Sequence, residues 1–145
     1  MPARHTSLYP THIASGAKLT EFAGYEMPVS YPSGSRAEHH HTRNAASLFD
    51  TSHMGQFRLT GDQAAAWLAS EVSADITRLA PGMSTYALLC RDDGGVIDDL
   101  FVYRGDDHLF VVVNAARRER DFAHLTRHLP PTGVSLSDES DTTAM

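Results

Sequence analysis

Two β-rich runs joined by a short turn constrain the fold of this chain more than any other feature. Ser84–Cys90 and Val96–Tyr103 are rich in β-branched and aromatic residues, and Arg91–Gly95 separates them. The Asp93-Gly94 pair within that turn favours a hairpin, because these residues adopt positive φ at low cost. We therefore expect an antiparallel pair of strands here.

Periodicity predicts the other elements around this hairpin. In chain order they are a strand over Gln56–Thr60, a helix over Ala64–Val72, a strand over His108–Val113, a helix over Ala115–His128 and a short strand over Gly133–Leu136. Asn114 is placed to cap the second helix. This order of elements predicts an α+β fold, with an antiparallel sheet and the helices packed on one face.

The two ends of the chain give weaker patterns. Gly and Pro interrupt the first 35 residues at short intervals, which predicts irregular structure. A helix is expected to begin at Ser35, where Ser35 and Glu38 have the spacing of a capping box, and to extend towards Phe49. The segment Ser137–Met145 is acidic and rich in hydroxyl groups, and we expect it not to form a closing element.

Composition limits the class of protein. The 145 residues, 41% of them hydrophobic, suit one folded domain of ordinary size. Twelve Lys and Arg against 18 Asp and Glu give a net charge of −6, without a basic block, so nucleic acid is not an expected partner. No apolar run is long enough to span a membrane, the polar start Met1–Thr6 is unlike a secretory signal, and Cys90 has no second cysteine to pair with. We expect a cytoplasmic enzyme or binding domain.

Two adjacent carboxylates, Asp98 and Asp99, interrupt the apolar strand Val96–Tyr103. Strand side chains alternate, so Asp98 and Asp99 lie on opposite faces, and apolar residues flank both. An ionised carboxylate is costly in apolar surroundings unless it is paired or hydrogen-bonded. One of the two is therefore either a structural residue held by neighbouring groups or a functional carboxylate that faces a ligand cavity.

Other polar clusters give less support for chemistry. In Glu38–His41, successive helix positions point about 100° apart, which favours a solvated helix face over a metal site. His53 is expected to be a turn residue with a backbone partner. Ser52, His53 and Cys90 lack a spacing that identifies a nucleophile and its base, and no glycine-rich phosphate loop occurs.

Several segments together resemble a known family. They are Phe22–Val29, Arg43–Asp50, Ser52–Gln56, Gly94–Leu100 and Val113–Ala116. They resemble, in order, the amino-terminal part of the glycine cleavage system T-protein, the tetrahydrofolate-dependent aminomethyltransferase. The resemblance implies that residues 1–145 are the amino-terminal part of the folate-binding region, truncated before the remaining domains. It also implies transfer of an aminomethyl group from the lipoyl arm of the H-protein to tetrahydrofolate, with release of ammonia.

The same resemblance implies roles for individual residues. Asp99 would lie beside the reactive edge of the folate as the catalytic carboxylate, and Met54, Tyr86, Val112 and Asn114 would join it in binding folate. Tetrahydrofolate is then a co-substrate, lipoylated H-protein is the partner, and no metal is expected. A fragment of this length is expected to be inactive alone. The alternative is a non-catalytic folate-binding accessory protein, related to iron–sulfur cluster assembly factors, which generally lack the Asp-Asp strand.

Overall fold

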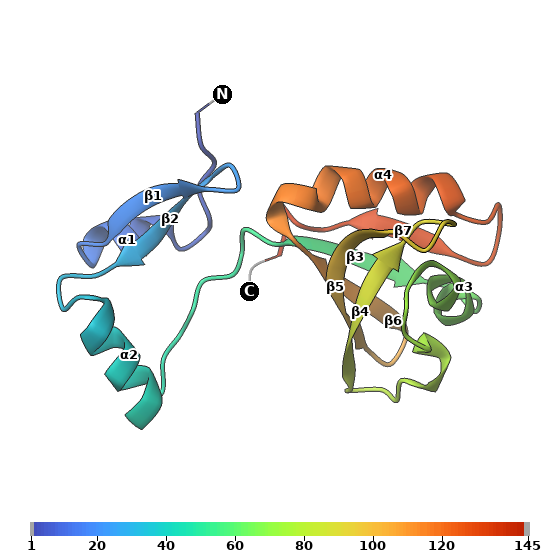
Figure 1. Ribbon diagram of the computed structural model, residues 1–145, viewed down its shortest axis with the longest axis horizontal. Helices are drawn as coiled ribbons and strands as arrows, with labels where there is room; N and C mark the ends of the chain where they lie inside the picture. The colour runs from blue at the N-terminus through green and yellow to red at the C-terminus, as the bar shows by residue number, and fades with distance from the viewer. Residues whose placement is uncertain (1, 144–145) are drawn as a thin grey trace. The chain divides into compact units, whose positions relative to one another are not determined.

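The computed structural model describes residues 2–143, which form two compact units where the sequence predicts one domain (Figure 1). The first unit ends at His53 and the second covers Met54–Thr143. The elements of the first are α1 (Tyr9–Ala14), β1 (Lys18–Phe22), β2 (Tyr25–Ser30) and α2 (Ser35–Asn44). Those of the second are β3 (Gly55–Thr60), α3 (Ala64–Glu71), η1 (Ile76–Arg78), β4 (Ser84–Cys90), β5 (Val96–Arg104), β6 (His108–Val113), η2 (Ala115–Arg117), α4 (Arg118–His128) and β7 (Ser135–Asp138).

A five-stranded sheet organises the second unit. Its strand order is β4-β5-β6-β3-β7, and every neighbouring pair is antiparallel. The predicted β4–β5 hairpin is confirmed, and its turn places Gly94 at a φ of +80°, where a side chain would be strained. A register shift at Leu89 and Cys90 bends the strand pair next to that turn.

The hydrophobic core lies on one face of this sheet. Leu100, Val102 and Val111 point into it from the strands, and Leu68 of α3 and Leu125 of α4 complete the same buried cluster. The prediction of an α+β fold with the helices on one sheet face is therefore confirmed. The opposite face keeps large apolar side chains exposed along β4 and β5.

The prediction of irregular structure in the first 35 residues is wrong, because α1, β1 and β2 form there. Pro10 lies in the first turn of α1, where its missing N–H costs nothing, and Gly24 turns the β1–β2 hairpin at a φ of +82°. The residues that suggested interruption therefore begin and connect regular elements.

Helix α2 begins at Ser35 as predicted, but the capping box and the extension to Phe49 are wrong. Gly34 occupies the N-cap position without a side-chain bond, and the Glu38 carboxylate accepts the Tyr31 N–H at 2.8 Å. The helix ends at Asn44, none of its side chains is buried, and Phe49 is 65% exposed beyond it.

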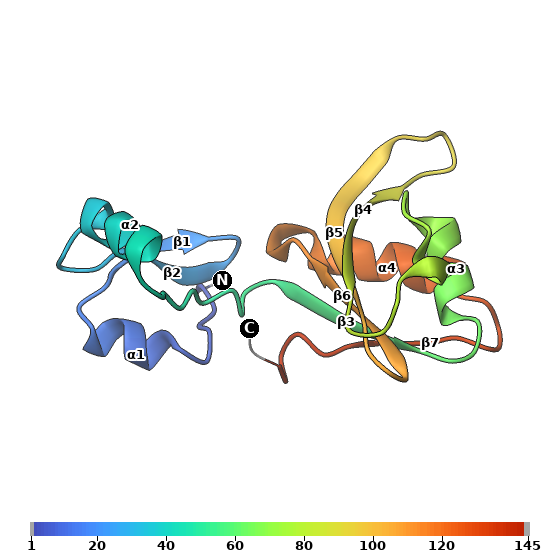
Figure 2. The same cartoon turned by 90° about the horizontal axis from the view of Figure 1, so that it is seen from below.

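The carboxyl-terminal segment does close the fold. Strand β7 forms two residues later than predicted and pairs with β3 (Figure 2). Ser140 beyond it is buried, and its Oγ accepts the Gln56 N–H at 2.8 Å. The expectation of no closing element is thus wrong for residues up to 143, whereas 144–145 lie outside the described residues. None of the helices described is both long and apolar enough to cross a membrane.

Candidate functional site

Strand alternation separates the two central carboxylates. Asp98 is 8% exposed and shares the core side of β5 with Leu100 and Val102, while Asp99 is exposed on the opposite face beside Phe101. The prediction that one carboxylate lies in apolar surroundings is confirmed, and that carboxylate is Asp98. Asp99 remains available to a ligand.

Asn114 connects the two carboxylates. Its Nδ2 donates to Asp98 Oδ1 at 3.0 Å, to Asp99 Oδ1 at 3.0 Å and to the Asp99 backbone carbonyl at 3.2 Å. Leu100 pairs with Val113, so Asn114 follows β6 directly beside Asp99. Its side chain makes no helix-capping bond, so the expected cap is wrong: these oxygens across the strands bind the amide instead.

A third carboxylate, Asp121, supports Asp98 from α4. Asp121 is fully buried, and neither its oxygens nor Asp98 Oδ2 has a hydrogen-bond partner among residues 2–143. Burial first, and then Asp98, raise the pKa of Asp121 to about 8 against the opposing charges of Arg117 and Arg120. At neutral pH Asp121 is therefore mostly a neutral acid, which adds no negative charge beside Asp98. The sequence analysis missed it, although Asp121 precedes buried Leu125 by one helical turn.

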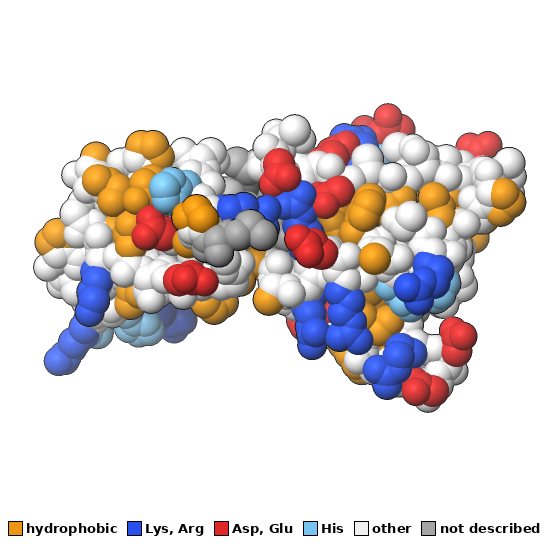
Figure 3. Space-filling model, turned by 90° about the horizontal axis from the view of Figure 1, so that it is seen from above, with side chains coloured by type: hydrophobic (Ala, Val, Ile, Leu, Met, Phe, Trp, Pro, Cys, Tyr) orange, Lys and Arg blue, Asp and Glu red, His pale blue; other side chains and the backbone are white. Residues whose placement is uncertain are grey.

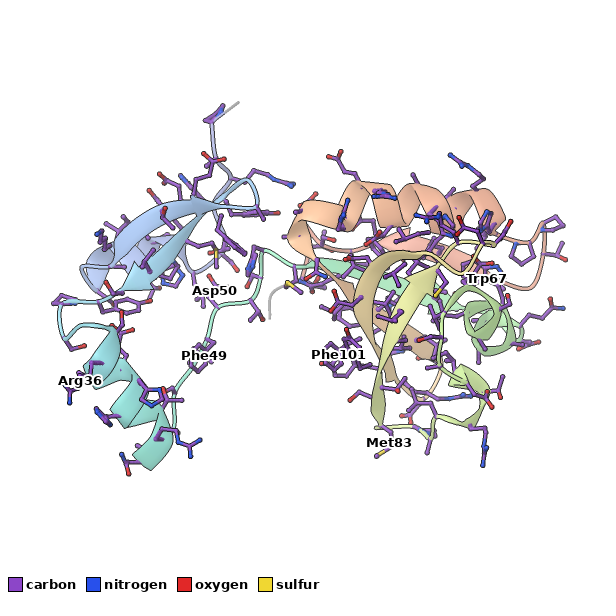
Figure 4. All side chains as sticks on the ribbon, viewed as in Figure 1. Arg36, Phe49, Asp50, Trp67, Met83 and Phe101 are labelled. Carbon is purple, nitrogen blue, oxygen red and sulfur yellow. The ribbon has the colours of Figure 1, made fainter. Side chains whose placement is uncertain are left out.

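Aromatic side chains form a platform next to Asp99. Tyr86 packs edge-on against Phe101, with 5.4 Å between ring centroids, and Phe101 lies 6.4 Å from Tyr103. Figure 4 shows Phe101 projecting from β5, with Trp67 on the other side of the sheet towards α3. Desolvation, and then the charge and hydrogen bond of Asp99, raise the pKa of Tyr86. An exposed aromatic surface beside a carboxylate suits a flat heteroaromatic ligand that carries N–H donors.

The sequence-predicted folate residues lie close to one another on this sheet. Tyr86, Phe101 and Val112 are paired across β4, β5 and β6. Phe101 lies two residues after Asp99 on β5 and therefore on the same face of the sheet. Val112 is only 5% exposed, so little of its side chain is open to a ligand. Met54 is half-buried and directly precedes the Gly55–Val113 pair, at the end of β6 from which Asn114 continues.

Two of the sequence predictions concern histidines. His39–His41 are exposed, as expected of a solvated helix face. His53 lies in a turn as expected. Its Nδ1 is buried without a hydrogen-bond partner in the described part of the chain, and its ring contacts Phe22 and Tyr25. Burial, opposed by Asp50, lowers the pKa of His53.

A buried network in the first unit was also missed. The Asp50 carboxylate accepts from Thr6 Oγ1 at 2.6 Å and lies 2.8 Å from His12 Nε2, and the other ring nitrogen of His12 contacts the Tyr31 hydroxyl at 2.8 Å. Burial opposes ionisation, but bonds from Thr6, His12 and Ser52 outweigh it and lower the pKa of Asp50 to about 2. The sequence gives little sign of this network, because His12 and Thr6 lie 38 and 44 residues from Asp50.

Comparison with known proteins identifies the family. The family model described as the GCVT N-terminal domain matches residues 8–145. The chain belongs to this family.

Individual members of the GCVT family extend the comparison. Proteins named aminomethyltransferase from Rubrobacter xylanophilus and Deinococcus deserti are 45% and 41% identical over 98% of this chain. The crystal structure of glycine cleavage system aminomethyltransferase T from Bartonella henselae superposes with a TM-score of 0.87 at 34% identity, over 93% of this chain. The chain spans 38% to 40% of the length of these relatives.

Proposed function

We propose that this chain is the amino-terminal, folate-binding part of an aminomethyltransferase of the glycine cleavage system. The observation that carries the proposal is Asp99, an exposed carboxylate that Asn114 holds beside the Tyr86–Phe101 platform. Relatives named aminomethyltransferase support transfer of an aminomethyl group. In this proposal the group moves from lipoylated H-protein to tetrahydrofolate, and ammonia is released.

Asp99 acts in this proposal as a fixed anion. Its carboxylate orients the amine groups of the folate and stabilises the positive charge that develops while the methylene carbon is transferred. The Asn114 amide fixes one Asp99 oxygen, so the anion needs little reorganisation when charge develops. Tyr86 and Phe101 offer apolar area to the flat ring, and Met54, Val112 and Asn114 complete the folate contacts of this chain.

Asp98 and Asp121 have a positioning role in the same proposal. Asp98 accepts from Asn114 on the core side, and protonated Asp121 neutralises part of the local charge. Three ionised carboxylates would repel one another and weaken the hold on Asn114. The neutral acid therefore lets Asp98 and Asp99 both remain acceptors for the same amide.

The relatives are more than twice as long as this chain. In this proposal, the remaining pocket residues correspond to the part of those relatives that the chain does not span. Binding of the lipoyl arm, closure over the pterin and action in the cytoplasm are parts of the proposal for the full protein. We expect no metal to take part in the transfer step.

The experiment measures transfer by an aminomethyltransferase whose amino-terminal third is this chain. Aminomethyl-loaded, lipoylated H-protein and tetrahydrofolate are mixed with it, and ammonia and methylenetetrahydrofolate are quantified. The proposal predicts equal amounts of both products, formed only when tetrahydrofolate is present. Saturable binding of tetrahydrofolate without ammonia release would instead identify a non-catalytic folate-binding accessory protein.

A further inference from the structure

A second cluster of polar side chains lies where the end of α3 meets the end of α4, away from the Asp99 platform. Glu71 is the last residue of α3, and His124 and His128 lie in the last two turns of α4. One potential ligand atom from each lies within 4.8 Å of the other two. In Figure 3, histidine side chains appear beside arginines on the face over α4.

The spacing in the sequence explains why these histidines face the same way. Positions 124 and 128 are four apart, so both rings project from one face of α4, with 4.3 Å between centroids. Trp67 Nε1 donates to the His128 carbonyl at 3.1 Å and holds the end of α4 against α3. Glu71, one turn after Trp67 on α3, therefore meets both rings.

The distances suit one metal ion between the three groups. Glu71 Oε2 lies 2.8 Å from His128 Nδ1 and 3.5 Å from His124 Nε2. Tetrahedral zinc ligands at about 2.0–2.1 Å from the ion stand about 3.3 Å from one another. The Glu71–His124 separation already matches this spacing, and the Glu71–His128 contact needs to lengthen by about 0.5 Å for both atoms to reach one ion.

His124 is the least satisfied member of the cluster. Its Nε2 is buried and makes no hydrogen bond within the described residues, and the Glu71 carboxylate lies 3.5 Å away. A buried imidazole nitrogen without a hydrogen bond is costly, and a metal ion between it and Glu71 would satisfy its lone pair.

We propose that Glu71, His124 and His128 form a Zn²⁺ site that joins the ends of α3 and α4. Two imidazoles and a carboxylate are a donor set that zinc accepts, and His128 is partly exposed, so water can take the fourth position. The site binds metal independently of the transfer reaction and stabilises the second unit. The expectation of no metal concerned the transfer chemistry, and the proposed Zn²⁺ site is a separate site elsewhere in the second unit.

The test is equilibrium dialysis of the full 145-residue chain against buffered Zn²⁺, together with thermal unfolding at the same free Zn²⁺. We expect one ion per chain and a melting temperature at least about 5 °C higher when free Zn²⁺ is a hundredfold above Kd. His128→Gln keeps a partner for Glu71 but removes a ligand, and His124→Gln and Glu71→Gln remove the other two. Each is expected to weaken binding at least about 100-fold.

The matched control replaces the three exposed histidines His39, His40 and His41 of α2 with Ala. This variant should bind Zn²⁺ as the original chain does, because these rings do not converge on one point. Loss of binding in the control variant, or unchanged binding in folded His128→Gln, would overturn the proposal. Failure of the original chain to bind one Zn²⁺ would overturn it as well.

Discussion

Replacing Asp121 with Asn should make the protein more stable at neutral and alkaline pH. Asp121 is fully buried, and its pKa is raised to about 8 by burial and by Asp98. Asn has nearly the same shape and stays neutral at every pH. Asp121→Asn therefore keeps the packing and removes the cost of ionisation.

The sign and size of the effect follow from proton binding. The pKa of Asp121 is 3.8 in the unfolded state and about 8 in the folded state. At pH values between the two, the folded state binds the Asp121 proton and the unfolded state does not. The Asp121 contribution to stability is therefore present in full below pH 4 and is lost as pH rises to about 8. At about 1.36 kcal/mol per pKa unit, the original chain should lose about 4 kcal/mol relative to Asp121→Asn between pH 5 and pH 8.

Urea unfolding of both proteins at half-unit steps from pH 5 to pH 8 measures this difference directly. Subtracting the two free energies removes the contribution of every other titrating group. Asp106→Asn, at an exposed carboxylate in the β5–β6 turn, is the matched control and should give a constant difference. If the difference in unfolding free energy between Asp121→Asn and the original chain stays constant, or favours the original chain as pH rises, Asp121 is not protonated in the folded state.

Three further predictions concern the chain as a whole. The 145-residue chain alone should release no ammonia above the uncatalysed rate in the H-protein assay, because part of a pocket cannot exclude water; clear turnover would contradict this. The exposed apolar residues Phe49 and Phe101 should favour self-association, so sedimentation of a clean monomer that binds no hydrophobic dye would refute that prediction. Asp50 should contribute about 2 kcal/mol that is present above pH 4 and lost as pH falls to about 2, because its pKa drops from 3.8 to about 2. Asp50→Asn should remove that stability at pH 7, and thermal unfolding with an unchanged midpoint would contradict this.

The sequence predicted the second unit well because its patterns are local. Alternation places Asp98 and Asp99 on opposite faces, and the Asp93-Gly94 turn sets the hairpin. In the first unit, Gly and Pro were taken as signs of loops, yet Pro10 begins a helix and Gly24 turns a hairpin. Gly and Pro occur both in loops and at the ends of helices and strands. Contacts between residues distant in sequence decide which of the two forms.

Contacts between distant segments explain the rest of what sequence reasoning missed. Asn114 fits a helix cap by its position, but two carboxylates 15 and 16 residues away bind its amide. Asp121 reaches Asp98 only because α4 packs over β5, and His124 meets Glu71 only because α3 ends beside α4. Helical spacing alone indicates that Asp121 and Leu125 share a face, without showing what that face meets.

The comparison of Asp99→Asn with Asp98→Asn tests the central claim most directly. Both are made in an aminomethyltransferase that carries this chain, and turnover and melting temperature are measured with H-protein and tetrahydrofolate. Asp99→Asn should lower kcat by roughly 100- to 1,000-fold with near-normal melting, since it removes one preorganised charge from an exposed position. Asp98→Asn should cost much less turnover, because its side chain points into the core. Equal losses of kcat in the two variants, or unfolding of Asp99→Asn, would show that the carboxylate pair is structural and that the proposed chemistry lies elsewhere.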